Sequence, residues 1–174
     1  DDVLLGGLGI DTLEGGQGDD TLDGGGGIDL LLGGIGDDHL VAGEGTLDGG
    51  SGFDVVLLER DGGDATVSIG ASGALLTVDG SALNAAFIGI EGLELSLGAG
   101  NDSVSAGAIG ATGVGSMTVL GGAGNDAIDG TGLDVALLAD AGVGNDLLKG
   151  GAGHDRLVGG EGNDRLFAGQ GDDT

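Results

Sequence analysis

The strongest constraint on the fold is a nine-residue periodicity in the sequence. From Ala141 to Thr174 the chain reads AGVGNDLLK, GGAGHDRLV, GGEGNDRLF and AGQGDDT, so that units of nine residues follow one another in register. Glycine holds the second and fourth places of each unit, aspartate holds the sixth, and leucine holds the eighth place of each complete unit. No single unit can bury its leucine alone, so we expect several units to stack into one array.

Each unit divides into a turn and a short strand. The first six residues are rich in glycine, which lets the backbone take positive φ angles and point its carbonyl oxygens inward. The last three residues can run as a strand, in which neighbouring side chains alternate sides, so the eighth residue faces the interior. Two units make one coil, and the turns of every second unit stack on the same edge. The sequence therefore predicts an all-β solenoid.

The sixth-place aspartates are the residues arranged for a recognisable chemistry. A cation between stacked turns would meet their carboxylates and the inward carbonyls, and hard oxygen ligands of this kind suit calcium, which takes roughly six to eight of them. A solvated acidic turn is the alternative reading for any single aspartate. We predict that the metal ligands are Asp2, Asp11, Asp20, Asp29, Asp38, Asp54, Asp102, Asp126, Asp134, Asp146, Asp155, Asp164 and Asp173. Counting stacked turn pairs gives on the order of 6 to 10 calcium ions.

The consensus GGxGxDxUx resembles the calcium-binding nonapeptide of the RTX (repeats-in-toxin) family. The units at 141–174 carry this resemblance, and so do GGLGIDTLE, GGQGDDTLD, GGGGIDLLL and GGIGDDHLV near the N-terminus. The resemblance implies a parallel β-roll with calcium held between stacked turns. It also implies export by a type I secretion system, with the chain unfolded in the calcium-poor cytosol and folding outside. The expected location is therefore secreted, extracellular or at the cell surface.

The repeats occupy two blocks, 1–57 and 121–174, which an irregular segment at 58–120 separates. In the first block the unit AGEGTLD at 42–48 is two residues short. Aligned on Leu47 as its inward residue, this unit has lost the sixth-place aspartate, which predicts a weakened or missing calcium site on that edge.

The segment 58–120 reads as short strands with alternating apolar residues, such as ATVSIG, ALLTVDG and LELSLG, around one isolated repeat unit that contains Asp102. Two structures could account for it. The solenoid continues in longer, metal-poor coils, or a small β-sandwich interrupts it. Short strands need neighbours that bury their faces, which favours continuation.

The composition is strongly acidic, with 30 acidic against four basic residues and a formal charge of −26. Binding to nucleic acid or to an anionic membrane relies on Lys and Arg, so neither is an expected partner. The sequence has no apolar run of about 18 residues, and we expect no membrane insertion. Without metal, stacked carboxylates repel one another and the 46 glycines are costly to order. With metal, ligation free energy becomes folding free energy, and we expect folding to be coupled to calcium.

No constellation for catalysis is visible, and we expect this chain not to be an enzyme. His39 and His154 lie far apart, no cysteine occurs, and the serines stand in no G-x-S-x-G motif. Outward apolar residues predict lateral contacts with other copies or with neighbouring domains. These residues are Val3, Leu5, Leu30, Leu32, Val55, Leu57 and Phe167.

These observations predict a calcium-binding structural β-roll segment of a large secreted or cell-surface bacterial protein of the adhesin, surface-layer or filament type. The chain opens on DDVLL, the end of a repeat unit, so we expect it to be a piece of a longer protein. The alternative is the C-terminal secretion and folding module of a type I secreted hydrolase (a protease or a lipase) or of a toxin. The interruption at 58–120 favours the first function. A catalytic domain upstream in the parent gene would favour the second.

Overall fold

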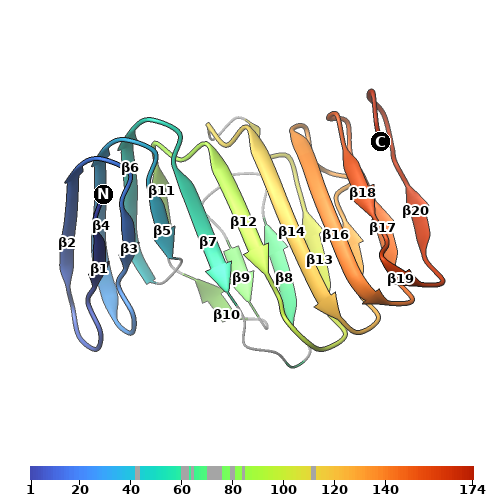
Figure 1. Cartoon of the computed structure of the whole chain (residues 1–174), viewed down its shortest axis with the longest axis horizontal. Coiled ribbons are helices and arrows are strands. Elements are labelled where there is room, and N and C mark those ends of the chain that lie inside the picture. The colour runs from blue at the N-terminus through green and yellow to red at the C-terminus, as the bar shows by residue number, and fades with distance from the viewer. Residues whose placement is uncertain are drawn as a thin grey trace.

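The chain forms an elongated roll of two β layers, with the N-terminus at one end and the C-terminus at the other (Figure 1). The computed structural model describes residues 1–41, 44–59, 63, 65–69, 76–78, 81–83, 85–110 and 113–174. These described residues contain β-strands and no α-helix. The observed architecture is therefore the predicted parallel β-roll.

One sheet, here the front sheet, runs along the whole roll and faces the viewer in Figure 1. Its order is β1-β3-β5-β7-β12-β14-β16-β18, and β19 pairs with β16 beyond the end of β18. All these pairs are parallel. The strands are β1 (Val3–Leu5), β3 (Thr21–Asp23), β5 (His39–Val41), β7 (Val55–Glu59), β12 (Gly92–Ser96), β14 (Ser116–Ala123), β16 (Ala136–Gly144), β18 (Arg156–Val158) and β19 (Glu161–Gly162).

The rear layer is divided into two sheets. The first back sheet has the order β2-β4-β6-β11, with β2 (Thr12–Gln17), β4 (Ile28–Ile35), β6 (Glu44–Ser51) and β11 (Ala85–Ile88). The second has the order β10-β9-β8-β13-β15-β17-β20. Its strands are β8 (Thr66–Ile69), β9 (Leu76–Val78), β10 (Ser81–Leu83), β13 (Ser103–Ala106), β15 (Ala127–Asp129), β17 (Leu147–Lys149) and β20 (Arg165–Phe167).

The division of the rear layer comes from the irregular segment 58–120. After β7 the chain enters the second back sheet with β8, and it returns to the first back sheet only with β11. Between them β8, β9 and β10 form a meander whose pairs are antiparallel, unlike the other described strand pairs. Antiparallel neighbours can be joined by short turns, so three strands fit within one enlarged coil. Because β12 pairs with both β7 and β14, the front sheet passes across this insertion without a break. The division of the chain into three domains stays a prediction.

The core consists of inward side chains stacked from coil to coil. On the front sheet the register places Leu4, Leu22, Leu40, Val56, Leu93, Met117 and Leu137 in one row. The rear rows are Leu13, Leu31, Leu47 and Phe87 in the first sheet, and Val67, Val104, Ile128, Leu148 and Leu166 in the second. Leu22, Leu40 and Leu148 are fully buried, whereas Leu166 is 43% exposed because β20 is the last strand of its sheet. The predicted inward role of the eighth place is confirmed.

The second- and fourth-place glycines make the close stacking of the turns possible. Gly34 and Gly36 have φ angles of 116° and 135°, which side chains of L-residues rarely tolerate. A β-carbon at either position would also collide with the carbonyl oxygen of the glycine one coil earlier, Gly16 or Gly18. The glycine periodicity therefore fixes both the turn conformation and the distance between coils.

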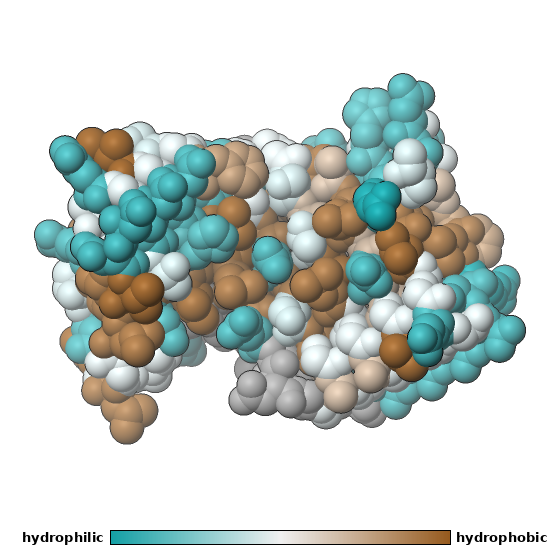
Figure 2. All heavy atoms as spheres, in the orientation of Figure 1, coloured by the Kyte–Doolittle hydropathy of each residue, from teal (hydrophilic) through white to brown (hydrophobic). Residues whose placement is uncertain are grey.

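Apolar side chains also occur on the outside of the roll. Val3, Leu5 and Phe167 are exposed, while the predicted outward residues of β4 and β7 are half-buried. Figure 2 shows apolar and polar residues interspersed over the front face. Lateral packing on another chain or domain stays a prediction. Within the part of the chain that the structure describes, no helix has the length and apolar character needed to cross a membrane.

The stacked core yields a stability prediction. We expect Leu40→Ala to lower the free energy of unfolding by about 2–5 kcal/mol, because the residue is fully buried and leaves a cavity between two coils. Leu138→Ala removes the same atoms from the outward face of β16, where the side chain is 38% exposed, and should cost under about 1 kcal/mol. Urea unfolding with calcium present measures both. Equal losses would contradict the assignment of the core.

Candidate calcium sites

The predicted aspartate ligands lie mainly along two edges of the roll, where turns lead into strands. The front edge contains the turns that enter the front sheet, and the back edge contains those that enter the back sheets. Asp2, Asp20, Asp38, Asp54, Asp155 and Asp173 lie on the front edge. Asp11, Asp29, Asp102, Asp126, Asp146 and Asp164 lie on the back edge. The turns thus bring residues about one coil apart in sequence into two rows.

Each row is tied together by hydrogen bonds from backbone to carboxylate. The amide of Asp20 donates to Oδ1 of Asp38 over 2.8 Å, and the amide of Asp38 donates to Oδ1 of Asp54 over 2.9 Å. The same bond recurs on the back edge, from the amide of Asp102 to Asp126 and from Asp126 to Asp146, at 2.8 Å each. One oxygen of each carboxylate therefore links successive coils.

The other carboxylate oxygen is buried without a hydrogen-bond partner. This holds for Oδ2 of Asp11, Asp20, Asp38, Asp54, Asp102, Asp126 and Asp146. Leaving a charged oxygen buried and unsatisfied is costly, and a repeated cost of this kind calls for a partner. The recurrence at seven positions indicates a common binding feature.

Carbonyl oxygens of the next coil share the space of these unpaired carboxylate oxygens. A β-carbon at Gly15 would meet both Oδ2 of Asp20 and the carbonyl oxygen of Gly33, the latter at 2.6 Å. On the back edge, a β-carbon at Gly121 would lie 2.5 Å from Oδ2 of Asp126 and 2.8 Å from the carbonyl oxygen of Ala141. Each such place is a small cradle formed by a carboxylate of one coil and a backbone carbonyl of the next.

The donor set of the cradles fits calcium. Calcium takes carboxylate and backbone carbonyl oxygens in flexible geometry, whereas zinc favours sulfur and nitrogen ligands. Among the described residues, no three His, Cys, Asp or Glu side chains are grouped so that they could hold a metal. A bound ion would therefore receive most of its ligands from backbone carbonyls, which the glycine-rich turns direct toward it.

The electrostatics of the rows also favour a cation. Burial raises the pKa of Asp38, Asp54 and Asp126 above the ordinary value, and the neighbouring carboxylates of each row raise it further. The amides that donate to these carboxylates lower the pKa, but they offset only part of the effect. A positive ion between the coils would reverse the penalty, because it favours the charged form of every carboxylate around it.

Two departures from the regular repeat are resolved by the strand register. Asp29 stands opposite Gly45, so the short unit at 42–48 has no carboxylate at that level, as its alignment on Leu47 predicts. The loss of an ion there stays a prediction. Asp102, from the isolated unit in the irregular segment, joins the back-edge row.

Asp134 lies apart from both rows, although its sequence context predicts a ligand. Its side chain is exposed, and its Oδ1 accepts hydrogen bonds from the amides of Ile109 and Gly110 at 2.9 Å each. These bonds, with the one from Gly110 foremost, lower the pKa of Asp134. Its carboxylate therefore fastens Ile109 and Gly110 to the chain just before β16, which points to a structural role.

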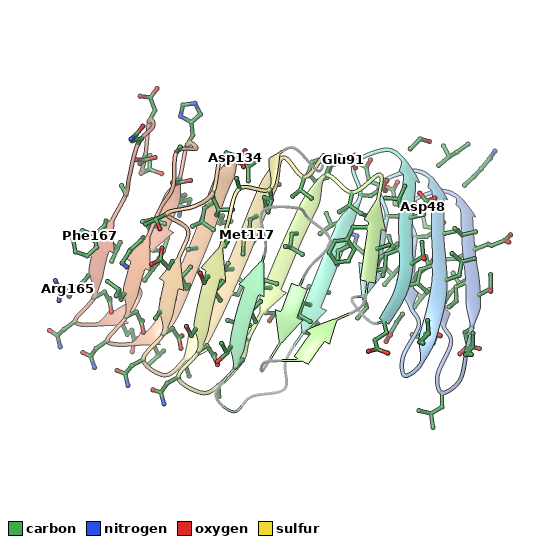
Figure 3. All side chains as sticks on the ribbon, turned by 180° about the vertical axis from the view of Figure 1, so that it is seen from behind. Asp48, Glu91, Met117, Asp134, Arg165 and Phe167 are labelled. Atoms are coloured by element: carbon green, nitrogen blue, oxygen red, sulfur yellow. The ribbon has the colours of Figure 1, made fainter. Side chains whose placement is uncertain are left out.

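The structure adds Glu91, which the nine-residue aspartate pattern does not include. Figure 3 shows Glu91 on the edge of the roll where β12 begins. Its Oε2 accepts a hydrogen bond from the amide of Asp54 over 3.0 Å, the role that sixth-place aspartates have elsewhere. A signal was present in the sequence, since Glu91-Gly92-Leu93 keeps the spacing between the sixth-place acid and the eighth-place apolar residue.

In the turns that enter the second back sheet, the fifth places form a second ladder, of asparagines. The side-chain amide of Asn125 donates to Oδ1 of Asn101 over 3.1 Å, and Asn145 and Asn163 continue the series at 3.1 and 3.2 Å. These residues are exposed, so the ladder ties the outside of the turns while the aspartates face inward. On the front edge, Asp19 and Asp37 hold the same places.

Comparison with known proteins agrees with this arrangement. The sequence matches the family described as RTX calcium-binding nonapeptide repeat (4 copies) at residues 1–31, 14–46, 23–56, 118–132 and 140–174, which together cover more than half of the chain. The matched ranges contain all the predicted ligands except Asp102 and Asp134. A search of curated protein sequences gives no significant match.

The raised pKa values predict an unusual pH dependence for the calcium-free chain. A carboxyl whose pKa is raised on folding contributes stability that is fully present below its unfolded pKa, near 3.8, and is lost as the pH rises through the folded value. We therefore expect the chelated chain to gain strand signal in circular dichroism when it is acidified from neutral pH toward about 4. The calcium-loaded chain should show the opposite trend, because protons compete with the ion. Parallel trends in both samples would contradict this account.

The position of Asp134 outside the rows predicts a contrast between two variants. Asp126→Asn removes charge from a buried cradle and should weaken calcium binding, with fewer ions bound at a limiting calcium concentration. Asp134→Asn removes the same charge from an exposed residue and should leave the number of bound ions unchanged. Isothermal titration calorimetry on both variants makes the comparison. A loss of ions in Asp134→Asn alone would reverse the assignment.

Proposed function

Because the chain belongs to the RTX calcium-binding nonapeptide repeat family, we propose that it is a structural β-roll segment of a large secreted or cell-surface bacterial protein, of the adhesin, surface-layer or filament type. Several calcium ions between the turns hold it together. In this proposal the segment catalyses no reaction. Its role is to form a rigid, elongated body where calcium is available. The predicted aspartates of the two rows are its ligands.

The observation that carries the proposal is the repeated cradle with an unpaired, buried carboxylate oxygen. Seven such oxygens cannot be left charged inside a fold that has a net charge of −26 without a strong cost. Calcium would remove the cost and add ligation free energy to folding. A chain with these properties is poorly folded at cytosolic calcium levels and folds at extracellular ones. This supports a location outside the cell.

The continuity of the front sheet supports the structural role over that of an accessory module. β12 connects the two repeat blocks across the meander, so the segment extends as one sheet from β1 to β18. Stacked repeats of this kind gain stability from each neighbour and can be extended by adding coils. Length and stiffness are the properties that an adhesin or filament segment needs.

A calcium titration followed by far-UV circular dichroism tests the proposal. We expect strand signal and thermal stability to rise cooperatively with calcium, because each ion bridges two coils. Magnesium at the same concentrations should fail, since it demands tight octahedral geometry at about 2.0–2.1 Å and dehydrates reluctantly. A chelated chain that keeps its strands and melts no earlier than the loaded one would refute the proposal.

The structural role has its own measurement. Limited proteolysis with calcium present should protect the two repeat blocks and β12 together, because one sheet joins them. Cleavage that releases the two blocks as separate folded pieces would count against a continuous stiff segment and in favour of two independent modules.

A further inference from the structure

The front edge departs from the repeat at the turn between β11 and β12. Ile88 is level with Asp48, so Gly89 is level with Gly49, the first residue of the turn one coil earlier. Gly92 is level with Val55, so Glu91 is level with Asp54, the last residue of that turn. Residues 89–91 thus span the same turn for which the preceding coil uses residues 49–54.

Despite this shortening, the oxygens of a cradle remain in place. A β-carbon at Gly49 would collide with both Oδ2 of Asp54 and the carbonyl oxygen of Gly89. In the regular repeat, a β-carbon added at Gly33 would meet the equivalent two oxygens, Oδ2 of Asp38 and the carbonyl oxygen of Gly49. The carbonyl of Gly89 therefore replaces that of a first-place glycine.

Glu91 replaces the carboxylate. In the regular coils, Oδ1 of a sixth-place aspartate accepts the amide of the aspartate one coil earlier, at 2.8 Å for Asp20 and 2.9 Å for Asp38. Here Oε2 of Glu91 accepts the amide of Asp54 at 3.0 Å. The additional methylene group of glutamate lets the carboxylate reach this level from a shorter turn.

Asp54 supplies an independent indication of a ligand. Its side chain is 0% exposed, and its Oδ2 has no hydrogen-bond partner among the described residues. Burial, together with the carboxylates of Asp38 and Glu91, raises the pKa of Asp54. Two carboxylates that converge next to an inward carbonyl require a cation or a proton to be stable at neutral pH.

We propose that Asp54, Gly89 and Glu91 form a non-consensus calcium site, in which Glu91 provides the second carboxylate and through which the metal row of the front edge continues into the irregular segment. The residues of the turn 89–91 lie outside the ranges that match the family. The inference rests on the proposed calcium-dependent function and extends it. The ion at this site fastens β12 to β7, and so fastens the insertion to the first repeat block.

Counting bound ions by native mass spectrometry tests the site. Glu91→Gln keeps an oxygen that can accept the amide of Asp54 but removes the charge, and we expect it to bind one calcium ion fewer than the unmodified chain. Glu94→Gln is the matched control. It makes the same change on the same strand at an outward, half-buried position, and it should keep every ion. An unchanged count in Glu91→Gln, or an equal loss in both variants, would overturn the inference.

A second measurement does not depend on the variant folding. In the folded, calcium-loaded chain without substitutions, exchange of calcium for lanthanum should shift the carboxylate carbon resonance of Glu91, while that of Glu94 should stay in place. A Glu91 resonance that does not move when the carboxylate resonances of the aspartates respond would overturn the site and leave the calcium-dependent function intact. An unmodified chain that binds no calcium at all would instead refute the function itself.

Discussion

Carboxylates stacked from coil to coil are the feature on which the rest of the structure depends. A sixth-place aspartate such as Asp38 uses one oxygen to accept the amide of the preceding coil, here that of Asp20, and buries the other oxygen without a partner. The hydrogen bond sets the register between turns, and the unpaired oxygen makes the stack unfavourable until a cation is present. The same residue therefore specifies the fold and makes that fold conditional on the ion.

The apolar core adds to the stability of the stacked turns but cannot replace the ions between them. Inward residues such as Leu22 and Leu40 are fully buried, but strands such as β3 and β5 are only three residues long and contribute one inward side chain each. Every coil is stabilised mainly by the coils on either side, as in other repeat proteins. Such an array is lengthened by repeating the same short sequence unit, and its stability depends on each junction between coils.

Three departures from the repeat lie in one region of the roll. The short unit at 42–48, the β8–β10 meander and the shortened turn at 89–91 all adjoin the place where the rear layer divides. The front sheet stays continuous there because β12 keeps the register of β7 and β14. One layer thus preserves the geometry of the roll while the other accommodates an insertion, and Glu91 keeps a carboxylate in the front row at that level.

The sequence by itself determined what each unit encodes locally. Positive-φ glycines define the turn, alternation along the strand points Leu40 or Leu148 inward, and nine-residue spacing places the aspartates in rows. Only the tertiary structure decided which acids share a level. It brought Asp102 into the back row, left Asp134 outside, and set Glu91 beside Asp54, 37 residues away. The physical reason is that stacking between coils depends on strand register, and the length of the intervening chain does not fix that register once the nine-residue step is broken.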